Sequence, residues 1–272
     1  SWPVPLPRDY VLGVDHQRAV MESQHPVFLD GRWTLDGFGD YYARTMWYKL
    51  PHPLQSSVLL AVLFLIWPGS ERRELRTQIL LCTPVVLMFV IGSSTSMQLG
   101  LRYILPVLPF LVLFAAQIGR WMQWSRYRWR TGVVCLTAIL APIGVRYHPN
   151  HLAYFNELAG GPERGYEHLI DSNIDWGQNL RDLKDYLGEH GVGRIGLAYF
   201  GTVPPAELGI DYELPPVGTP QPGWYAISVN FLQGRSHALR GPDNRHVAPD
   251  FGAYQYFRSF EPEARIGYSI YV

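Results

Sequence analysis

Apolar residues are concentrated in four runs in the first half of the chain, which cover Leu54–Trp67, Thr77–Ser93, Leu99–Ile118 and Thr131–Val145. A helix needs about 20 apolar residues to cross a bilayer, and about 17 suffice. The third run meets this length, the second just meets it, and the first can extend back through Trp47. None carries the polar stripe of a helix on a soluble surface. The pattern predicts four transmembrane helices, with a buried soluble bundle as the alternative.

The charges between these runs predict which side of the membrane each loop faces. Arginines fall between the first and second runs and between the third and fourth: Arg72, Arg73 and Arg76, then Arg120, Arg126, Arg128 and Arg130. The loop at residues 94–98 has no charge. Because cytoplasmic loops are rich in Lys and Arg, both arginine loops are expected inside the cell. We therefore expect a multi-pass protein of the bacterial inner membrane whose C-terminal part is extracytoplasmic.

After residue 146 the pattern changes to that of an α/β domain. β-rich stretches occupy His168–Ser172, Arg194–Phe200, Trp224–Asn230 and Arg265–Val272. A helix is expected over Gly177–Glu189, with its leucines on one stripe, capped by Asp175 and ended by Gly191. Strand, helix and strand within about 30 residues predict a βαβ unit. A second helix is expected near Ala253–Phe260.

The expected fold is therefore an α-helical membrane bundle of four transmembrane helices followed by a small extracytoplasmic α/β domain. We divide the chain into an extracytoplasmic loop and interfacial segment (1–53), a transmembrane region (54–147) and the α/β domain (148–272).

Polar residues follow the predicted strands of this domain. Ligands of open α/β sheets bind at the carboxyl ends of the strands. Asp171, Asn173, Asp175 and Trp176 follow the first predicted strand and are candidate contacts for a sugar or its acceptor. Residues 199–201, 228 and 230 follow the next two. The alternative is that this segment only caps the following helix, because Asp, Ser and Asn are common cap residues.

Composition and short motifs exclude several classes. The chain has 23 basic and 23 acidic residues, so its formal charge is zero, which argues against a nucleic-acid partner. Two cysteines are too few for a disulfide scaffold. His148 and His151 flank a proline and have no third ligand nearby in sequence, so we predict no metal site. The G-x-G-x-x-G at 191–196 follows a predicted helix instead of a strand, so no nucleotide cofactor is expected.

Two cations stand at the predicted outer edge of the membrane. Lys49 precedes the first apolar run, and Arg102 opens the third. Charge at this depth is costly and often functional. Arg binds phosphate with a fork of donors and Lys as a point charge, so both are candidates for the phosphate of a lipid carrier. The alternative is that both side chains only anchor the helix ends by reaching to the interface.

Three aspartates stand in the aromatic segment before the first run. Asp30, Asp36 and Asp40 are candidates for binding a sugar hydroxyl or for acting as a base. The alternative is an amphipathic segment that lies in the membrane interface.

Several stretches together carry a family resemblance. They are FLDGRWTLDGFGDYYARTMWYKLPHP (28–53), LRYILPVLPFL (101–111), HPNHLAYFNELAGGPERGYEHLIDSNIDWGQNLRDLKDYL (148–187), GIDYELPP (209–216) and the ending RIGYSIYV. The chain resembles the C-terminal part of bacterial polyprenyl-phosphate-sugar-dependent glycosyltransferases. These are protein-mannosyltransferase-like enzymes of family 39 type in the C-type superfamily.

The resemblance implies a function, and it also implies that the catalytic residues of the family are not all in this chain. It implies transfer of a sugar from a polyprenyl-phosphate carrier to an extracytoplasmic acceptor that is a protein, lipid or wall glycan. Lys49, Arg102 and Tyr103 would contact the donor phosphate, with no cofactor and no divalent metal. The family's acidic base lies in an earlier outer loop, so we expect an N-terminally truncated chain that lacks it. The alternative function is a non-catalytic, membrane-anchored glycan-binding or scaffold subunit.

Overall fold

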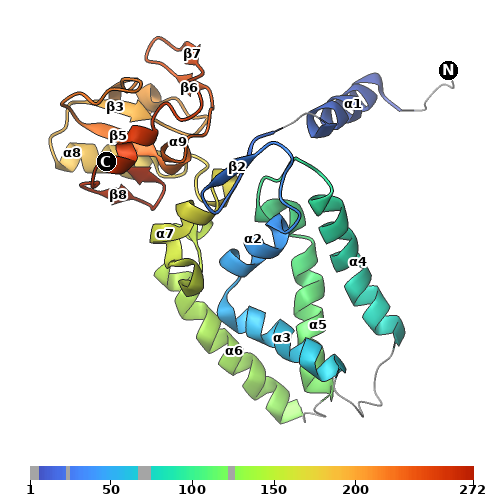
Figure 1. Ribbon diagram of the computed structural model, residues 1–272. Helices are drawn as coiled ribbons and strands as arrows, with labels where there is room; N and C mark the ends of the chain where they lie inside the picture. Colours follow the sequence, from blue (N-terminus) through green and yellow to red (C-terminus); the bar gives the residue numbers. More distant parts are fainter. Residues whose placement is uncertain (1–5, 23–24, 67–74, 122–125) are drawn as a thin grey trace. The chain divides into compact units, whose positions relative to one another are not determined.

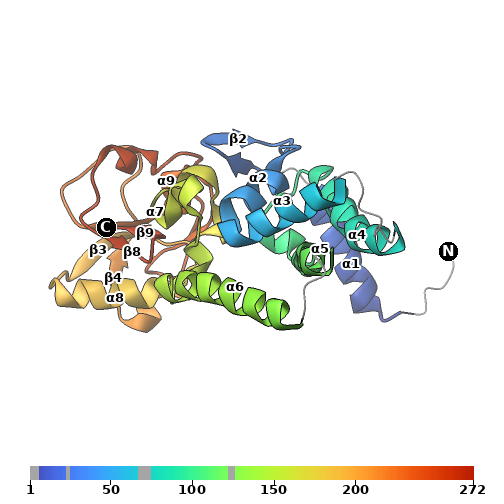
Figure 2. The same cartoon turned by 90° about the horizontal axis from the view of Figure 1, so that it is seen from below.

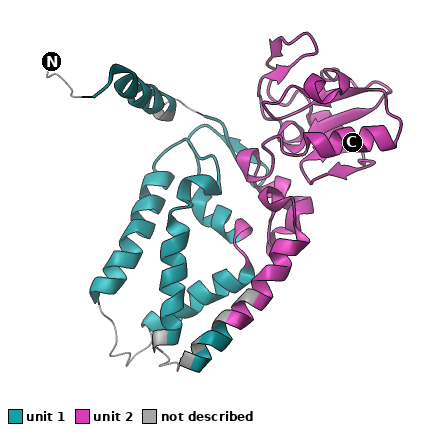
Figure 3. Ribbon diagram, turned by 180° about the vertical axis from the view of Figure 1, so that it is seen from behind, with its two compact units in different colours: residues 1–47, 52–132 teal, residues 48–51, 133–272 magenta. Residues whose placement is uncertain are grey.

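The computed structural model describes residues 6–22, 25–66, 75–121 and 126–272. The chain forms two compact units (Figure 3). Unit 1 comprises residues 1–47 and 52–132, and unit 2 comprises residues 48–51 and 133–272. The segment 48–51 therefore packs with the C-terminal unit, although it lies between two helices in sequence.

Unit 1 is helical apart from one hairpin (Figure 1). Its elements are α1 (Arg8–Glu22), β1 (Val27–Leu29), β2 (Arg32–Thr34), α2 (Tyr41–Lys49, whose last two residues belong to unit 2), α3 (His52–Ile66), α4 (Leu75–Ser93), the 3-10 helix η1 (Leu101–Ile104) and α5 (Val107–Trp121). Asp30 and Gly31 join the two strands with φ of 49° and 77°, as a type I′ turn requires. The Asp-Gly pair thus sets the hairpin register.

Helices α3, α4 and α5 pack on one another through a small apolar cluster. Ala61, Leu81 and Phe114 are its buried members, one from each helix. The side chain of Gln78 in α4 donates a hydrogen bond to that of Gln117 in α5, at 2.7 Å. The two amides thus pair with each other, and many apolar side chains of the three helices are exposed.

The expectation of four transmembrane helices is wrong. In the described part of the chain, only α4 is both long and apolar enough to cross a membrane. Helices α3 and α5 have 15 residues each and are therefore about 22 Å long, shorter than a hydrocarbon core of about 30 Å. Helix α6 (Arg126–Arg146) has 21 residues but carries four arginines, at positions 126, 128, 130 and 146.

The third apolar run does not form a transmembrane helix, because it is not one continuous helix. Residues 101–104 form η1, and α5 begins only after Pro106. Proline has no backbone N–H to donate, so it interrupts the helical hydrogen bonds that would have joined the two parts. Among the loop arginines on which the predicted orientation rests, Arg72 and Arg73 lie outside the described residues, as do the side chains of Arg120 and Arg126.

Unit 2 contains a mixed sheet of five strands in the order β4-β3-β5-β9-β8. The strands are β3 (Arg194–Ala198), β4 (Asp211–Glu213), β5 (Tyr225–Ser228), β8 (Arg265–Ile266) and β9 (Ile270–Tyr271). Strand β3 runs parallel to both β4 and β5, whereas β9 runs antiparallel to β5 and β8. A separate two-stranded ribbon joins β6 (Leu239–Arg240) and β7 (His246–Val247). The parallel strands point their carboxyl ends toward one edge.

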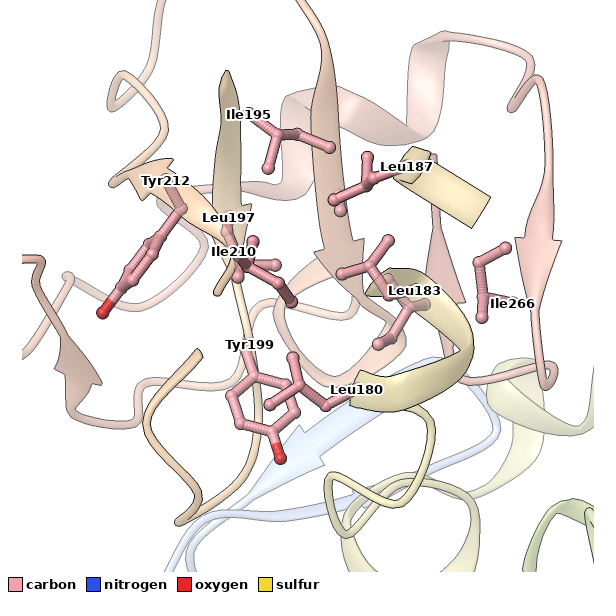
Figure 4. Close-up of a cluster of buried hydrophobic side chains, with 11 residues drawn as sticks. Leu180, Leu183, Leu187, Ile195, Leu197, Tyr199, Ile210, Tyr212 and Ile266 are labelled. Atoms are coloured by element: carbon pink, nitrogen blue, oxygen red, sulfur yellow. The ribbon is translucent and has the colours of Figure 1, made fainter. Parts of the chain in front are cut away.

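Helix α8 (Leu180–Glu189) lies against one face of this sheet (Figure 2). Its leucines 180, 183 and 187 meet Ile195 and Leu197 of β3 in the core (Figure 4). The predicted helical stripe is thus confirmed. Unit 2 also includes residues 133–146 of α6. Its other helices are short: α7 (Gly161–His168), α9 (Val229–Leu232) and the 3-10 helices η2 (His151–Ala153), η3 (Glu157–Ala159), η4 (Asp171–Asn173), η5 (Pro205–Leu208) and η6 (Gln255–Ser259).

The first strand of the predicted βαβ unit is absent. Helix α7 runs to His168, Leu169 and Ile170 are extended and buried, and η4 follows. These two apolar residues fill the core but pair with none of the described strands. Two smaller expectations also fail, because Asn179, not Asp175, is the N-cap residue of α8, and the last predicted strand is the hairpin β8–β9.

Candidate functional site

A buried polar cluster lies where β3 and β5 end. Ser228, the last residue of β5, donates a hydrogen bond to Oδ2 of Asp175, and the backbone N–H of Gly177 donates to Oδ1 at 2.8 Å. Asp175 and Ser228 are both fully buried. Burial raises the pKa of Asp175 to about 7, although these two hydrogen bonds act to lower it. The carboxyl group is therefore poised to change charge near neutral pH.

A second carboxylate in the cluster is paired. Arg235 holds Asp171 in an ion pair of 2.6 Å, and the backbone N–H of Asp171 donates to Oδ1 of Asn230. Asp171 has a φ of 62°, in the left-handed region that non-glycine residues rarely adopt. Two residues of the segment that follows β5 thus converge on one aspartate that is distant from them in sequence.

Two donors of this cluster have no partner. Nδ2 of Asn230 and Nε of Arg235 are buried, and neither finds an acceptor among the described residues. Leaving a buried donor unpaired costs about 1–3 kcal/mol. Native proteins pair nearly all such groups, so these two N–H groups are unusual and make the cluster a candidate binding site.

An aromatic group flanks these donors. Trp176 is 55% exposed, and its ring lies 6.0 Å from that of the buried Phe200. The Arg235 guanidinium lies 5.6 Å from the centre of Phe200, and the ring of His237 lies 4.6 Å from it. Partial burial and the charge of Arg235 lower the pKa of His237. The cluster therefore combines hydrogen-bond donors, a titratable carboxyl group and an exposed indole face.

Glycine at position 177 is required to close this arrangement. Its φ is +79°, and a Cβ there would meet the Tyr199 hydroxyl and lie 2.8 Å from Cα of Gly201. The Tyr199 hydroxyl donates to the Gly177 carbonyl at 2.8 Å. The turn after Trp176 therefore packs directly onto the end of β3.

Lys49 is buried within unit 2. Its Nζ donates to the carbonyl oxygens of Leu152, at 2.8 Å, and Asn173, at 2.6 Å, and lies 4.3 Å from the centre of the Phe155 ring. Burial lowers the pKa of Lys49 to about 7. Its two acceptors match the two N–H groups of a neutral amine. This geometry fastens segment 48–51 to the rest of unit 2, and a contact of Lys49 with phosphate stays a prediction.

The other predicted phosphate residues lie in unit 1. Arg102 and Tyr103 are both exposed, and the guanidinium of Arg102 lies 5.2 Å from the centre of the Tyr103 ring. Both residues stand in η1. A guanidinium is a fork of donors that suits a phosphate group, so a phosphate contact of Arg102 and Tyr103 stays a prediction.

The three N-terminal aspartates are placed differently from one another. Arg44 binds Asp30 at 2.8 Å and Asp40 at 2.6 Å, so these two carboxylates neutralise one guanidinium between the hairpin and α2. Asp36 is exposed, and its backbone N–H donates to Thr34. None of the three belongs to unit 2.

The structure brings Asp171 and Asp175 together with Ser228 and Asn230, although the first strand on which the sheet-edge argument depended is absent. That these residues and Trp176 contact a sugar stays a prediction. The backbone carbonyl of Asn173 instead accepts a hydrogen bond from the side chain of Lys49. Two members of the cluster, Arg235 and His237, are not predicted from the sequence, because both follow the short helix α9 that turns the chain back onto the strand end. No local pattern marks them.

Within the described ranges, no group of three or more His, Cys, Asp or Glu side chains is arranged to hold a metal ion. Comparisons of the chain with protein-family models, with curated proteins and with solved structures found no match. The case for function therefore depends on the residues of the cluster and on the sequence resemblance.

Proposed function

We propose that the protein binds a sugar carried on a polyprenyl phosphate at the outer face of the bacterial plasma membrane, as the C-terminal part of a glycosyltransferase. The observation that carries the proposal is the pair of unpaired donors, Asn230 Nδ2 and Arg235 Nε, beside the exposed indole of Trp176. Sugars offer hydroxyl oxygens to such donors and an apolar C–H face to an aromatic ring.

The helices of unit 1 support a lipid-linked donor. Leu87, Val90 and Ile91 of α4 are exposed, as are Leu59, Leu60 and Leu63 of α3. Apolar surface of this extent marks a contact with lipid or with another protein. Contact of these apolar helices with lipid would bring the chain into the environment where a polyprenyl carrier is found.

The proposed reaction is a displacement at the anomeric carbon. The acceptor oxygen forms a bond to that carbon, the bond from the carbon to the phosphate oxygen breaks, and the acceptor proton passes to a base. Arg102 would stabilise the negative charge that develops on the departing phosphate. The proposal gives this chain the binding of the donor, and the resemblance assigns the base to an earlier outer loop.

Binding to the full chain in detergent micelles tests the proposal. The probes are undecaprenyl phosphate with and without an attached hexose. Arg235→Lys keeps the charge beside Asp171 but removes the Nε–H, so we expect at least tenfold weaker binding of the sugar-bearing probe only. The matched control is Arg245→Lys, which alters an exposed arginine paired with Asp243. Equal binding of both probes by the wild-type protein would refute the sugar role of the cluster.

The phosphate role of Arg102 is tested separately. Arg102→Ala is expected to weaken binding of both probes alike, whereas Arg32→Ala, another exposed arginine of unit 1, is expected to leave it unchanged. Unaltered affinity in Arg102→Ala refutes this role. A transfer assay distinguishes the alternative function, because a non-catalytic glycan-binding subunit binds sugar without turnover, whereas part of a glycosyltransferase supports turnover when it is combined with the family segment that carries the acidic base.

A further inference from the structure

The sheet of unit 2 has a cavity on the face away from α8. It has a volume of about 850 Å³, within the range of ligand sites in proteins. Successive strand residues face opposite sides, so Tyr225 and Ile227 of β5 line the cavity while Ala226 packs in the core against α8. Gly196 of β3 leaves room for the Tyr225 ring, because a Cβ there would collide with that ring.

Aromatic rings form much of the cavity wall. Tyr225 and Phe257 lie 5.0 Å apart between ring centres, and Tyr166 and Tyr271 lie 5.4 Å apart. Two further lining residues face solvent, with Trp224 43% exposed and Phe260 53% exposed. Large aromatic side chains that stay exposed beside a cavity offer flat apolar platforms to a ligand.

Four charged side chains stand among these rings, namely those of Arg258, Glu261, Glu263 and Arg265. None of them forms an ion pair with another charged side chain in the described part of unit 2. Only Arg265 has a partner of another kind, because its guanidinium lies 5.1 Å from the centre of the Tyr271 ring. The cavity thus has free carboxylate acceptors and guanidinium donors with no net charge.

We propose that this cavity binds a short, uncharged oligosaccharide. A pyranose ring presents a C–H face that packs on an aromatic ring and an edge of hydroxyl groups that pair with carboxylates and guanidinium groups. A strongly charged ligand would meet two side chains of its own sign. The cavity shares none of its lining residues with the cluster at the carboxyl end of β5, so it is a second carbohydrate site beyond the proposed donor site.

The test uses the full chain in micelles and an array of neutral tetrasaccharides built from glucose, mannose or N-acetylglucosamine. We expect at least one to bind, and Trp224→Ala and Phe260→Ala each to weaken it at least tenfold. Glu261→Gln is expected to weaken it several-fold. The matched control is Phe251→Ala, which removes an exposed aromatic ring of unit 2 that lines neither the cavity nor the donor cluster and is expected to leave tetrasaccharide binding unchanged.

Three results would overturn the inference. The first is that no tetrasaccharide binds, and the second is that binding depends on Phe251 and not on Trp224. The third is that a proline-rich decapeptide, and no glycan, binds in a Trp224-dependent way, because such peptides also dock on aromatic grooves. Since the donor proposal is measured with polyprenyl phosphates and Arg235→Lys, either proposal can fail while the other stands.

Discussion

Nζ of Lys49 lies 2.6 Å from the backbone oxygen of Asn173, 124 residues further along the chain. This contact and the hydrogen bond to Leu152 tie the end of α2 to unit 2. The amide of Asn156 adds a further tie, donating to the Leu50 carbonyl at 3.0 Å. A lysine that the sequence suggests for a phosphate is therefore held inside the fold.

The buried amine of Lys49 should make the free energy of unfolding change with pH between about 7 and 10.5. Burial lowers the pKa of Lys49 to about 7 from 10.5, so the unfolded chain binds more protons than the folded chain between these values. Stability should therefore rise with pH across this window, by up to about 1.4 kcal/mol per pH unit from this group. Lys49→Met should lose this rise, as measured by denaturant unfolding between pH 7 and 9.5.

Lys184→Met is the control for that measurement. Lys184 also donates to a carbonyl, that of Gly209 at 2.9 Å, but from an exposed position. Its variant should keep the wild-type slope. If Lys49→Met keeps the slope as well, the amine is not buried as described.

Asp175 should make the free energy of unfolding change with pH in the opposite direction, between about pH 4 and pH 7. Burial raises its pKa to about 7 from 3.8, so the folded chain binds more protons than the unfolded chain between these values. Stability from this group is present below pH 4 and falls as pH rises to 7. Asp175→Asn keeps an acceptor for the Gly177 N–H, and we expect it to be more stable than the wild-type protein at pH 7.5.

The unfolding free energies of Asp175→Asn and of the exposed Asp185→Asn, measured from pH 4 to 7.5, check this prediction. The difference in unfolding free energy between Asp175→Asn and the wild-type protein should grow with pH. The corresponding difference for Asp185→Asn should stay constant. A constant difference in both variants would show that the carboxyl of Asp175 is ionised in the folded chain throughout.

Gly177→Ala should destabilise unit 2. The substitution forces an alanine to φ near +79° and pushes its methyl group against Tyr199 and Gly201. We expect a loss of about 2 kcal/mol or more in the free energy of unfolding. In contrast, Gly188→Ala in α8 meets open space and should gain about 0.5–1 kcal/mol. Equal effects of the two substitutions would contradict the turn geometry.

Leu183→Ala should show how much the α8 interface contributes. Leu183 is fully buried between the helix and the sheet (Figure 4). Removing its side chain leaves a cavity, and a cost of about 2–5 kcal/mol is expected from urea unfolding. Leu158→Ala, at an exposed leucine of unit 2, should change stability by less than about 0.5 kcal/mol. A small effect at both positions would show that α8 is not docked.

The sequence predicted the elements whose information is local. The leucine stripe specified α8 because residues three and four apart share one helical face, and Gly191 follows the helix end with a φ of 63°. Residues 169 and 170 misled the prediction, since a short buried apolar segment looks like a strand whether or not a partner strand lies beside it.

The sequence by itself determined the distribution of apolar runs, helix α8 of unit 2 and the polar residues that follow β5. Only the tertiary structure decided that Lys49 is buried, that Ser228 meets Asp175 across 53 residues, and that Arg235 returns to Asp171. The physical reason is that hydrophobic periodicity acts over a few residues. Burial, ion pairing and the pKa of a side chain depend instead on atoms that folding brings from distant parts of the chain.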